Sequence, residues 1–241
     1  MIDEDDANKE EGLVDLAMRG WRTLDEHPLD PRSKRVQLEH NELSTLPKTI
    51  GTLEFMYKLD VSHNRLEALP RSIGHCTRLR ILNVDHNYLE DIPKELGSCF
   101  FLEELNAEHN SLVTVPASLG GLQQLRELRL KHNRLEALPV EIGGLATLEV
   151  LDCSENENLT MVPKDLREDS EMVKFVIKLH YDTLRHITRI KENYAGAKAS
   201  LQKQEHANLR LRDAIEQCKA DKEAIIESLV PDEVNNNCCV S

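Results

Sequence analysis

The chain has 241 residues and a formal net charge of −13 at pH 7, because 43 Asp and Glu oppose 30 Lys and Arg. This balance argues against a nucleic-acid-binding protein, since such proteins need a basic surface to neutralise phosphates. No apolar run in the sequence reaches the roughly 18 residues that a membrane-spanning helix requires. Residues 1–12 are acidic and lack a signal-peptide pattern, so we expect a disordered acidic tail there.

Asparagine recurs at intervals of 23 residues through the middle of the chain. A leucine follows two residues later in five of these units, and then an aliphatic–proline pair such as Leu138-Pro139. A period this strict predicts a solenoid of stacked turns and no single globular core. An atypical first unit, with Arg19 in the asparagine position, extends the array to about seven turns over residues 13–168. The asparagines are Asn41, Asn64, Asn87, Asn110, Asn133 and Asn156.

Each position of the repeat has a physical role. Alternating apolar residues such as Leu128 and Leu130 predict one short strand per turn, with its apolar side turned inward. We expect the six asparagines to be structural and to bond backbone groups of their own turn and the next. Proline sets φ at the start of the convex segment. Glycine recurs at the same position of each repeat, where we expect a turn that needs the wider range of backbone angles open to glycine. These glycines are Gly51, Gly74, Gly97, Gly120 and Gly143.

The cysteines of the repeats occupy positions that hold aliphatic residues in other turns. Cys76 and Cys99 align with Leu53 and Leu122, and Cys153 aligns with Leu130. We therefore expect small buried hydrophobic residues here, with no disulfide bonds. Because cysteine-rich caps are also missing, a reducing, cytoplasmic location is predicted.

Units such as Leu138-Pro139-Val140-Glu141-Ile142-Gly143-Gly144-Leu145 resemble the intracellular leucine-rich repeat proteins of the Ras group. That family includes the Ras suppressor protein, the Shoc-type scaffold and the plant intracellular Ras-group-related proteins. The resemblance covers residues 13–168 and implies an α/β fold, a leucine-rich repeat solenoid with a curved parallel sheet. It also implies an intracellular scaffold in small-GTPase signalling or adhesion, and we expect a small GTPase or its regulator as partner.

Strand residues that alternate with the inward leucines are expected to form a concave binding face. They vary from turn to turn while the frame stays constant, and they combine an acidic centre with a small basic spot. A protein partner with a basic, partly polar patch is therefore predicted, although these positions could also be merely solvated. The convex side and Phe55, Phe100 and Phe101 are the other candidate surfaces. The expected concave residues are Asp60, Asn83, Asp85, Glu104, Asn106, Glu108, Arg129, Lys131 and Asp152.

Histidine precedes asparagine in five successive turns. In a parallel stack these side chains lie about 5 Å apart. Histidines aligned in one plane form a poor tetrahedral site, so no metal site is predicted, but they should resist being charged together. No phosphate loop, nucleophile elbow, CxxC pair or HExxH motif occurs, so we expect neither an enzyme nor a cofactor. The five residues are His40, His63, His86, His109 and His132.

Residues 169–230 lose the repeat and are rich in helix-forming residues. Met172, Val173, Val176 and Leu179 form an apolar face that is expected to cover the open end of the last turn. From residue 187 to residue 229, apolar residues recur at alternating intervals of three and four. Two interpretations stay open: a coiled coil that pairs two chains as a homodimer, or an unpaired solvated helix.

Residues 231–241 are expected to form a flexible tail that ends Cys238-Cys239-Val240-Ser241. This ending fits a prenylation box with Cys238 as the farnesylated residue. One lipid chain gives marginal, reversible binding, so we expect peripheral association with the cytoplasmic face of a membrane. The predicted function is a signalling scaffold tethered in this way. The alternative is a soluble coiled-coil structural or cytoskeletal adaptor that uses the repeats as a docking module.

Overall fold

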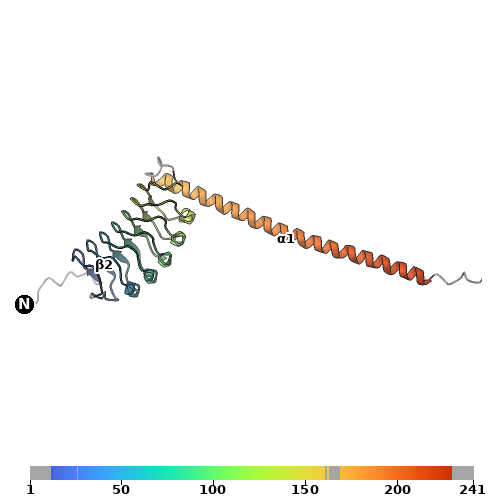
Figure 1. Cartoon of the computed structure of the whole chain (residues 1–241), viewed down its shortest axis with the longest axis horizontal. Coiled ribbons are helices and arrows are strands. Elements are labelled where there is room, and N and C mark those ends of the chain that lie inside the picture. The colour runs from blue at the N-terminus through green and yellow to red at the C-terminus, as the bar shows by residue number, and fades with distance from the viewer. Residues whose placement is uncertain (1–11, 26, 161, 163–168, 230–241) are drawn as a thin grey trace, which may run out of the picture. The chain divides into compact units, whose positions relative to one another are not determined.

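The computed structural model describes residues 12–25, 27–160, 162 and 169–229, with side chains through residue 223 (Figure 1). Seven parallel strands pair in chain order to form one curved sheet. A single helix, α1 (Ser170–Leu229), follows them. The strands are β1 (Leu13–Asp15), β2 (Arg35–Gln37), β3 (Lys58–Asp60), β4 (Ile81–Asn83), β5 (Glu104–Asn106), β6 (Glu127–Arg129) and β7 (Val150–Asp152). The predicted solenoid of seven turns followed by a long helix is confirmed.

The strand register follows the sequence period. Leu59 of β3 pairs with Leu82 of β4, and the same step of 23 residues continues to Leu151 of β7. The middle residue of every strand from β2 to β7 is buried, whereas its two neighbours are partly or fully exposed. Because side chains alternate along a strand, the first and third residues share the face opposite the core. That face carries the variable polar positions.

Each turn from β2 to β6 continues into a short 3-10 helix that begins directly after a proline. The prolines have φ between −59° and −71°, which the pyrrolidine ring imposes. Proline therefore acts at these positions as the sequence predicts. The 3-10 helices are η2 (Lys48–Thr52), η3 (Arg71–His75), η4 (Lys94–Ser98), η5 (Ala117–Gly121) and η6 (Val140–Gly144).

The recurrent glycines are required because a side chain at these positions would have no space. The expectation that they serve a turn with unusual backbone angles was wrong. A Cβ on Gly74 would lie 2.4 Å from the Glu95 carbonyl oxygen, and one on Gly120 would lie 2.5 Å from the Glu141 Cβ. Among the described glycines, only Gly12 and Gly20 have a positive φ. The 3-10 helices of neighbouring turns approach so closely that no side chain fits between them.

The aliphatic positions of all turns form one continuous core that extends into the start of α1. Cys76, Cys99 and Cys153 are buried free thiols within it, as predicted. Cys76 Sγ donates to the Ile50 carbonyl at 3.3 Å, and Cys99 Sγ donates to the Ile73 carbonyl at 3.4 Å. Burial raises the pKa of Cys76 to about 11 and that of Cys99 to about 12, so both stay protonated and unreactive.

The first turns of α1 cover the last repeat. The Asp169 side chain accepts hydrogen bonds from the backbone amides of Glu171 and Met172, at 3.0 and 3.1 Å, and so caps the helix. Val173 and Ile177, one helical turn apart, are fully buried.

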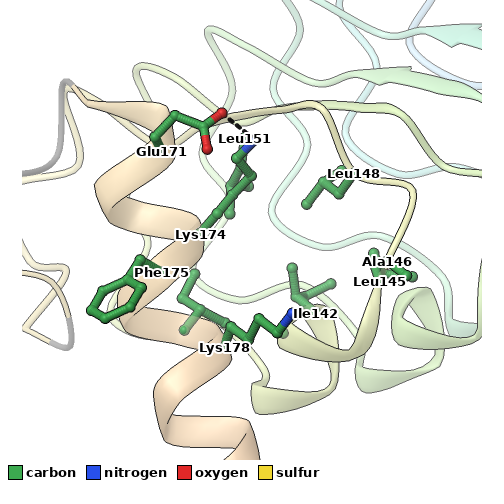
Figure 2. Close-up of a pocket in the computed structure, with 11 residues that line it drawn as sticks. Ile142, Leu145, Ala146, Leu148, Leu151, Glu171, Lys174, Phe175 and Lys178 are labelled. Atoms are coloured by element: carbon green, nitrogen blue, oxygen red, sulfur yellow. Dashed lines mark hydrogen bonds and ion pairs between the residues drawn. The ribbon is translucent and has the colours of Figure 1, made fainter.

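A cavity of about 280 Å³ remains between α1 and the last turn (Figure 2). It is lined by apolar side chains that include Ile142, Leu145 and Leu148 from the repeat side. Lys174 also lines it, with Nζ 2.6 Å from both the Glu149 carbonyl oxygen and the Glu171 carboxylate. The prediction that the start of the helix covers the last turn is therefore confirmed, but part of the helix face predicted to do so is exposed. Met172 and Leu179 are 36% and 57% exposed, and Ile177 had not been included.

The chain divides into two units, residues 1–184 and residues 185–241. In the second unit α1 continues as uninterrupted helix with exposed apolar side chains along it, among them Ile187, Ile190 and Tyr194. None of the helices within the described residues has a stretch long and apolar enough to cross a membrane.

Candidate functional site

The third residues of the strands form the first row of the concave face. Strand pairing places Asp60, Asn83, Asn106, Arg129 and Asp152 side by side in that order. The Asn83 amide donates to the Asp60 carboxylate at 3.1 Å, which links two turns. A hollow of about 160 Å³ lies on this face, and five of the nine predicted residues line it. Those five are Asp60, Asn83, Glu104, Asn106 and Arg129.

A second row lies two residues further along each turn, and the first row holds it in place. The Asn83 side-chain oxygen accepts the backbone amide of Asp85 at 3.2 Å, and the Asn106 oxygen accepts that of Glu108 at 3.1 Å. Asp152 holds the amide of Ser154 in the same way, at 2.9 Å. These bonds are side-chain mimics of a backbone turn. Changing a residue of the first row therefore also changes how the second row is presented.

The second row is acidic at its centre. The pKa of Glu108 is raised, first because the carboxyl is partly buried and then because Asp152 and Asp85 lie nearby. Lys131 and Arg129 oppose this shift without reversing it. Arg129 is itself held by Glu127, at 2.7 Å. Crowded carboxylates favour a cation from outside, because an added positive charge relieves their repulsion.

The histidines that precede the asparagines stack into a continuous ladder. Successive ring centroids are 4.1–4.4 Å apart, and the planes differ by 6–28°. All five residues have a positive φ, between 49° and 57°, a region in which histidine is enriched. Sequence reasoning missed this left-handed position, although the recurrence of His-Asn was its signal. Met18 and Glu155 continue it at the two ends.

Two groups along the ladder each bring three possible metal-ligand atoms within 4.8 Å of one another. They are His63, Asp85 and His86, and then Asp85, Glu108 and His109. His86 Nδ1 already lies 2.8 Å from an Asp85 oxygen. Stacked rings direct their nitrogens side by side, however, and not toward one point as a tetrahedral metal requires. We therefore propose no metal here.

Two of the stacked imidazoles, His63 and His109, are expected to titrate below their ordinary pKa. The pKa of His63 and that of His109 are lowered from 6.5, first by partial burial and then by neighbouring histidines, although Asp85 opposes the shift. The unfolded chain then binds these protons more readily. Stability should therefore fall as the pH drops from 6.5 through the lowered values.

Nuclear magnetic resonance titration of the full chain checks this expectation. In a His86→Asn variant the midpoints of His63 and His109 should rise, because asparagine tolerates the same positive φ but carries no proton charge. Midpoints that stay unchanged in this variant would show that the rings do not interact.

The asparagine side chains bridge neighbouring turns. Asn64 Nδ2 donates to the Val61 carbonyl of its own turn at 3.0 Å and to the Leu38 carbonyl of the preceding turn at 2.9 Å. Its Oδ1 accepts the amide of Leu43, also in the preceding turn, at 3.0 Å. The neighbour is thus the preceding turn, where we had expected the next one. The same pattern recurs at Asn87, Asn110, Asn133 and Asn156.

The predicted aromatic surface residues are exposed. Phe55, Phe100 and Phe101 are 45%, 62% and 47% exposed, so all three are surface aromatics. Cys238, the predicted lipidation residue, lies outside the described residues.

Comparison with known proteins supports the fold. Residues 34–131 match a family described as leucine-rich repeat region. A leucine-rich repeat protein of Leptospira interrogans is 36% identical over 64% of this chain and 40% of its own, with a TM-score of 0.59. The leucine-rich repeat domain of the type III effector XopL is 28% identical over 54% of this chain and 47% of its own, with a TM-score of 0.51.

The plant peptide hormone receptor RGFR1, solved in complex with RGF2, is 26% identical over 52% of this chain and 21% of its own, with a TM-score of 0.50. The chain thus spans less than half the length of each of these three structures. No curated protein matches the chain significantly. The repeated frame, the seven parallel strands and these matches show that the chain has a leucine-rich repeat fold, with residues 34–131 matching the family model.

Proposed function

We propose that the repeats form a scaffold whose concave face binds a protein with a basic, partly polar patch. Leucine-rich repeat folds are protein-interaction modules, and solenoids bind partners on their extended concave surfaces. The observation that carries the charge assignment is the carboxylate crowding around Glu108. A receptor among the similar structures is in complex with RGF2, which supports binding by this fold.

The proposed partner is a Ras-like small GTPase or a regulator of one, and the proposed tether is a farnesyl group on Cys238. The repeat units that resemble the Ras-group family support the first part, and the Cys238-Cys239-Val240-Ser241 motif supports the second. A single lipid binds membranes reversibly, so the proposed scaffold would exchange between membrane and cytoplasm.

Affinity purification from eukaryotic cells, followed by mass spectrometry, tests the concave face. Reversing the charge of both Asp85 and Glu108 to lysine should reduce recovery of the main partner by about tenfold or more, because like charges would then face a basic patch. Glu90→Lys with Glu136→Lys is the matched control, since both residues are exposed acids outside the predicted face. If the two double variants recover the same proteins, the acidic face is not the site. The lipid tether is tested in the same cells with a Cys238→Ser variant. If this variant and the wild type show the same membrane fractionation, the proposed tether is wrong.

The alternative function is a structural adaptor that dimerises through residues 187–229. Exposed apolar side chains on this part of α1 favour it, because a monomeric helix leaves them in water. Ile190 is 54% exposed, and Leu201 and Leu211 are 56% and 61% exposed. Such a dimer would also double any lipid anchor.

Sedimentation equilibrium of the full chain distinguishes the two states of the helix. If the chain dimerises, Ile190→Asp should weaken the dimer by about tenfold or more, because a carboxylate would enter an apolar seam. Leu209→Asp provides the control, since Leu209 is 58% exposed but does not belong to the seam. A wild-type chain that stays monomeric at high micromolar concentration excludes the coiled coil.

A further inference from the structure

An aromatic and basic groove lies at the edge of the sheet where the strands begin, away from the polar concave rows. Its volume is about 640 Å³. Arg78 lies over the Phe55 ring, with its guanidinium carbon 5.1 Å from the ring centroid. Arg80 pairs with Glu103 at 3.0 Å. The lining residues are Lys34, Phe55, Tyr57, Arg78, Arg80 and Phe101.

This groove departs from the charge of the whole molecule. Three of its six side chains are cationic, whereas the chain carries a net charge of −13. Phe55 and Phe101 remain about half exposed beside these cations. Apolar rings flanked by arginine favour an occupant that carries both carboxylates and apolar side chains.

The sequence holds such a segment directly before the first strand. Residues 1–11 contain six carboxylates and one lysine, together with Met1 and Ile2. The carboxylates are Asp3, Glu4, Asp5, Asp6, Glu10 and Glu11.

Gly12, which directly follows this segment, contacts Lys34 of the groove. The Gly12 carbonyl accepts the backbone amide of Lys34 at 2.8 Å, and a Cβ on Gly12 would lie 2.9 Å from the Lys34 side chain. The Lys34 carbonyl in turn accepts the amide of Tyr57, and that of Tyr57 accepts the amide of Arg80. The row that starts at Gly12 therefore leads along the groove.

Length permits the contact as well. Eleven extended residues span about 36 Å at roughly 3.3 Å each. Four steps between neighbouring strands, from β1 to β5, cover only about 19 Å. Phe101, which lies in the turn that leads into β5, is thus within reach.

We propose that residues 1–11 of the chain itself occupy the groove, with carboxylates beside Lys34, Arg78 and Arg80 and apolar side chains on Phe55 and Phe101. The groove shares no lining residue with the hollow of the concave face.

A carbodiimide cross-linking experiment on the full chain tests this contact. The reagent joins a carboxylate to an amine in direct contact, so an Arg78→Lys variant places a reporter amine in the groove. Gln124→Lys is the matched control, because Gln124 occupies the equivalent position two turns further on, still within reach of an extended segment but outside the groove. Peptide mapping should find Asp3–Asp6 joined to position 78 with a yield about fivefold above that at position 124, and salt at about 1 M should remove most of the difference.

Two further measurements make the result decisive. Adding Phe101→Ala to Arg78→Lys should lower the yield while the number of charges stays the same, and circular dichroism verifies that each variant folds. A mixture of ¹⁵N-labelled and unlabelled chains separates contacts within one chain from contacts between chains. Equal yields at positions 78 and 124 would overturn the proposal. Cross-links found only between labelled and unlabelled chains would overturn it too, and would assign the groove to the segment of a second copy.

Discussion

Replacing Asn87 with alanine is expected to destabilise the repeat domain by about 3–5 kcal/mol, because several buried backbone groups would lose their partner at once. Asn87 Oδ1 accepts the amide of Leu66 at 2.9 Å, and Nδ2 donates to the carbonyls of Val61 and Val84, both at 3.0 Å. The residue is only 5% exposed, so water cannot replace these bonds. Urea unfolding followed by circular dichroism measures the loss.

The nearby Glu67→Ala variant provides the control for this prediction. Glu67 is exposed in the preceding turn, directly after Leu66, and the hydrogen bond of its amide to Ser44 involves only the backbone. Its removal should change stability by less than about 0.5 kcal/mol. If Asn87→Ala lowered the free energy of unfolding as little as Glu67→Ala, the asparagine side chains that bridge the turns would contribute little to stability.

Truncating Ile177 to alanine is expected to cost about 2–4 kcal/mol and to loosen the last turn. Ile177 is fully buried where α1 meets the repeat, and its carbonyl oxygen would lie 2.8 Å from a Cβ on Gly143. Since each turn of a solenoid contacts only its neighbours, an uncovered end frays before the rest unfolds. Amide hydrogen exchange should therefore accelerate in β7 and η6 well before it does in β3.

Leu179→Ala tests whether the effect depends on the buried face of the helix. Leu179 belongs to the same helix but is 57% exposed, so its truncation should leave exchange in β7 nearly unchanged. Equal effects of the two variants would mean that helix propensity, and not the contact with the last turn, protects the end.

Much of the fold could be predicted from the sequence because one spatial constraint repeats in every turn. The period of 23 residues dictates the register from β2 to β7, and the inward positions follow from alternation about residues such as Leu82. The same period explains why Cys76 could be assigned to the core: it replaces a leucine in a known position. In a repeated pattern, the assignment of a position in one turn can be compared with the equivalent positions in the other turns.

The errors arose where a residue type has more than one physical use. Glycine permits unusual φ values but also permits close approach, and only the 2.4 Å separation at Gly74 shows which one applies. Left-handed backbone falls at histidines such as His86 instead. On α1 no repeat was present to select the buried face, so Met172 and Ile177 could not be ranked from spacing alone.

The candidate site was less predictable than the frame. Alternation placed Asp60 and Asn106 on the concave face, but it could not show that Asn106 fixes the bend that presents Glu108. The groove around Phe55 and Arg78 brings together residues 23 apart on a face that the strand pattern does not describe. Such neighbours in successive turns can be predicted only when equivalent repeat positions outside the strands are also compared.

The direction of the asparagine bridges affects how the protein would assemble during translation. Asn64 supplies bonding partners to Leu38 and Leu43, which leave the ribosome earlier than Asn64 does. Every coil is thus completed by the one synthesised after it, and a nascent chain always carries one unfinished coil at its growing end. At the far end Ser170 plays the completing part, since its hydroxyl accepts the Leu151 amide at 2.9 Å. The last turn of the array would therefore lack part of its hydrogen bonding until the start of the helix has been synthesised.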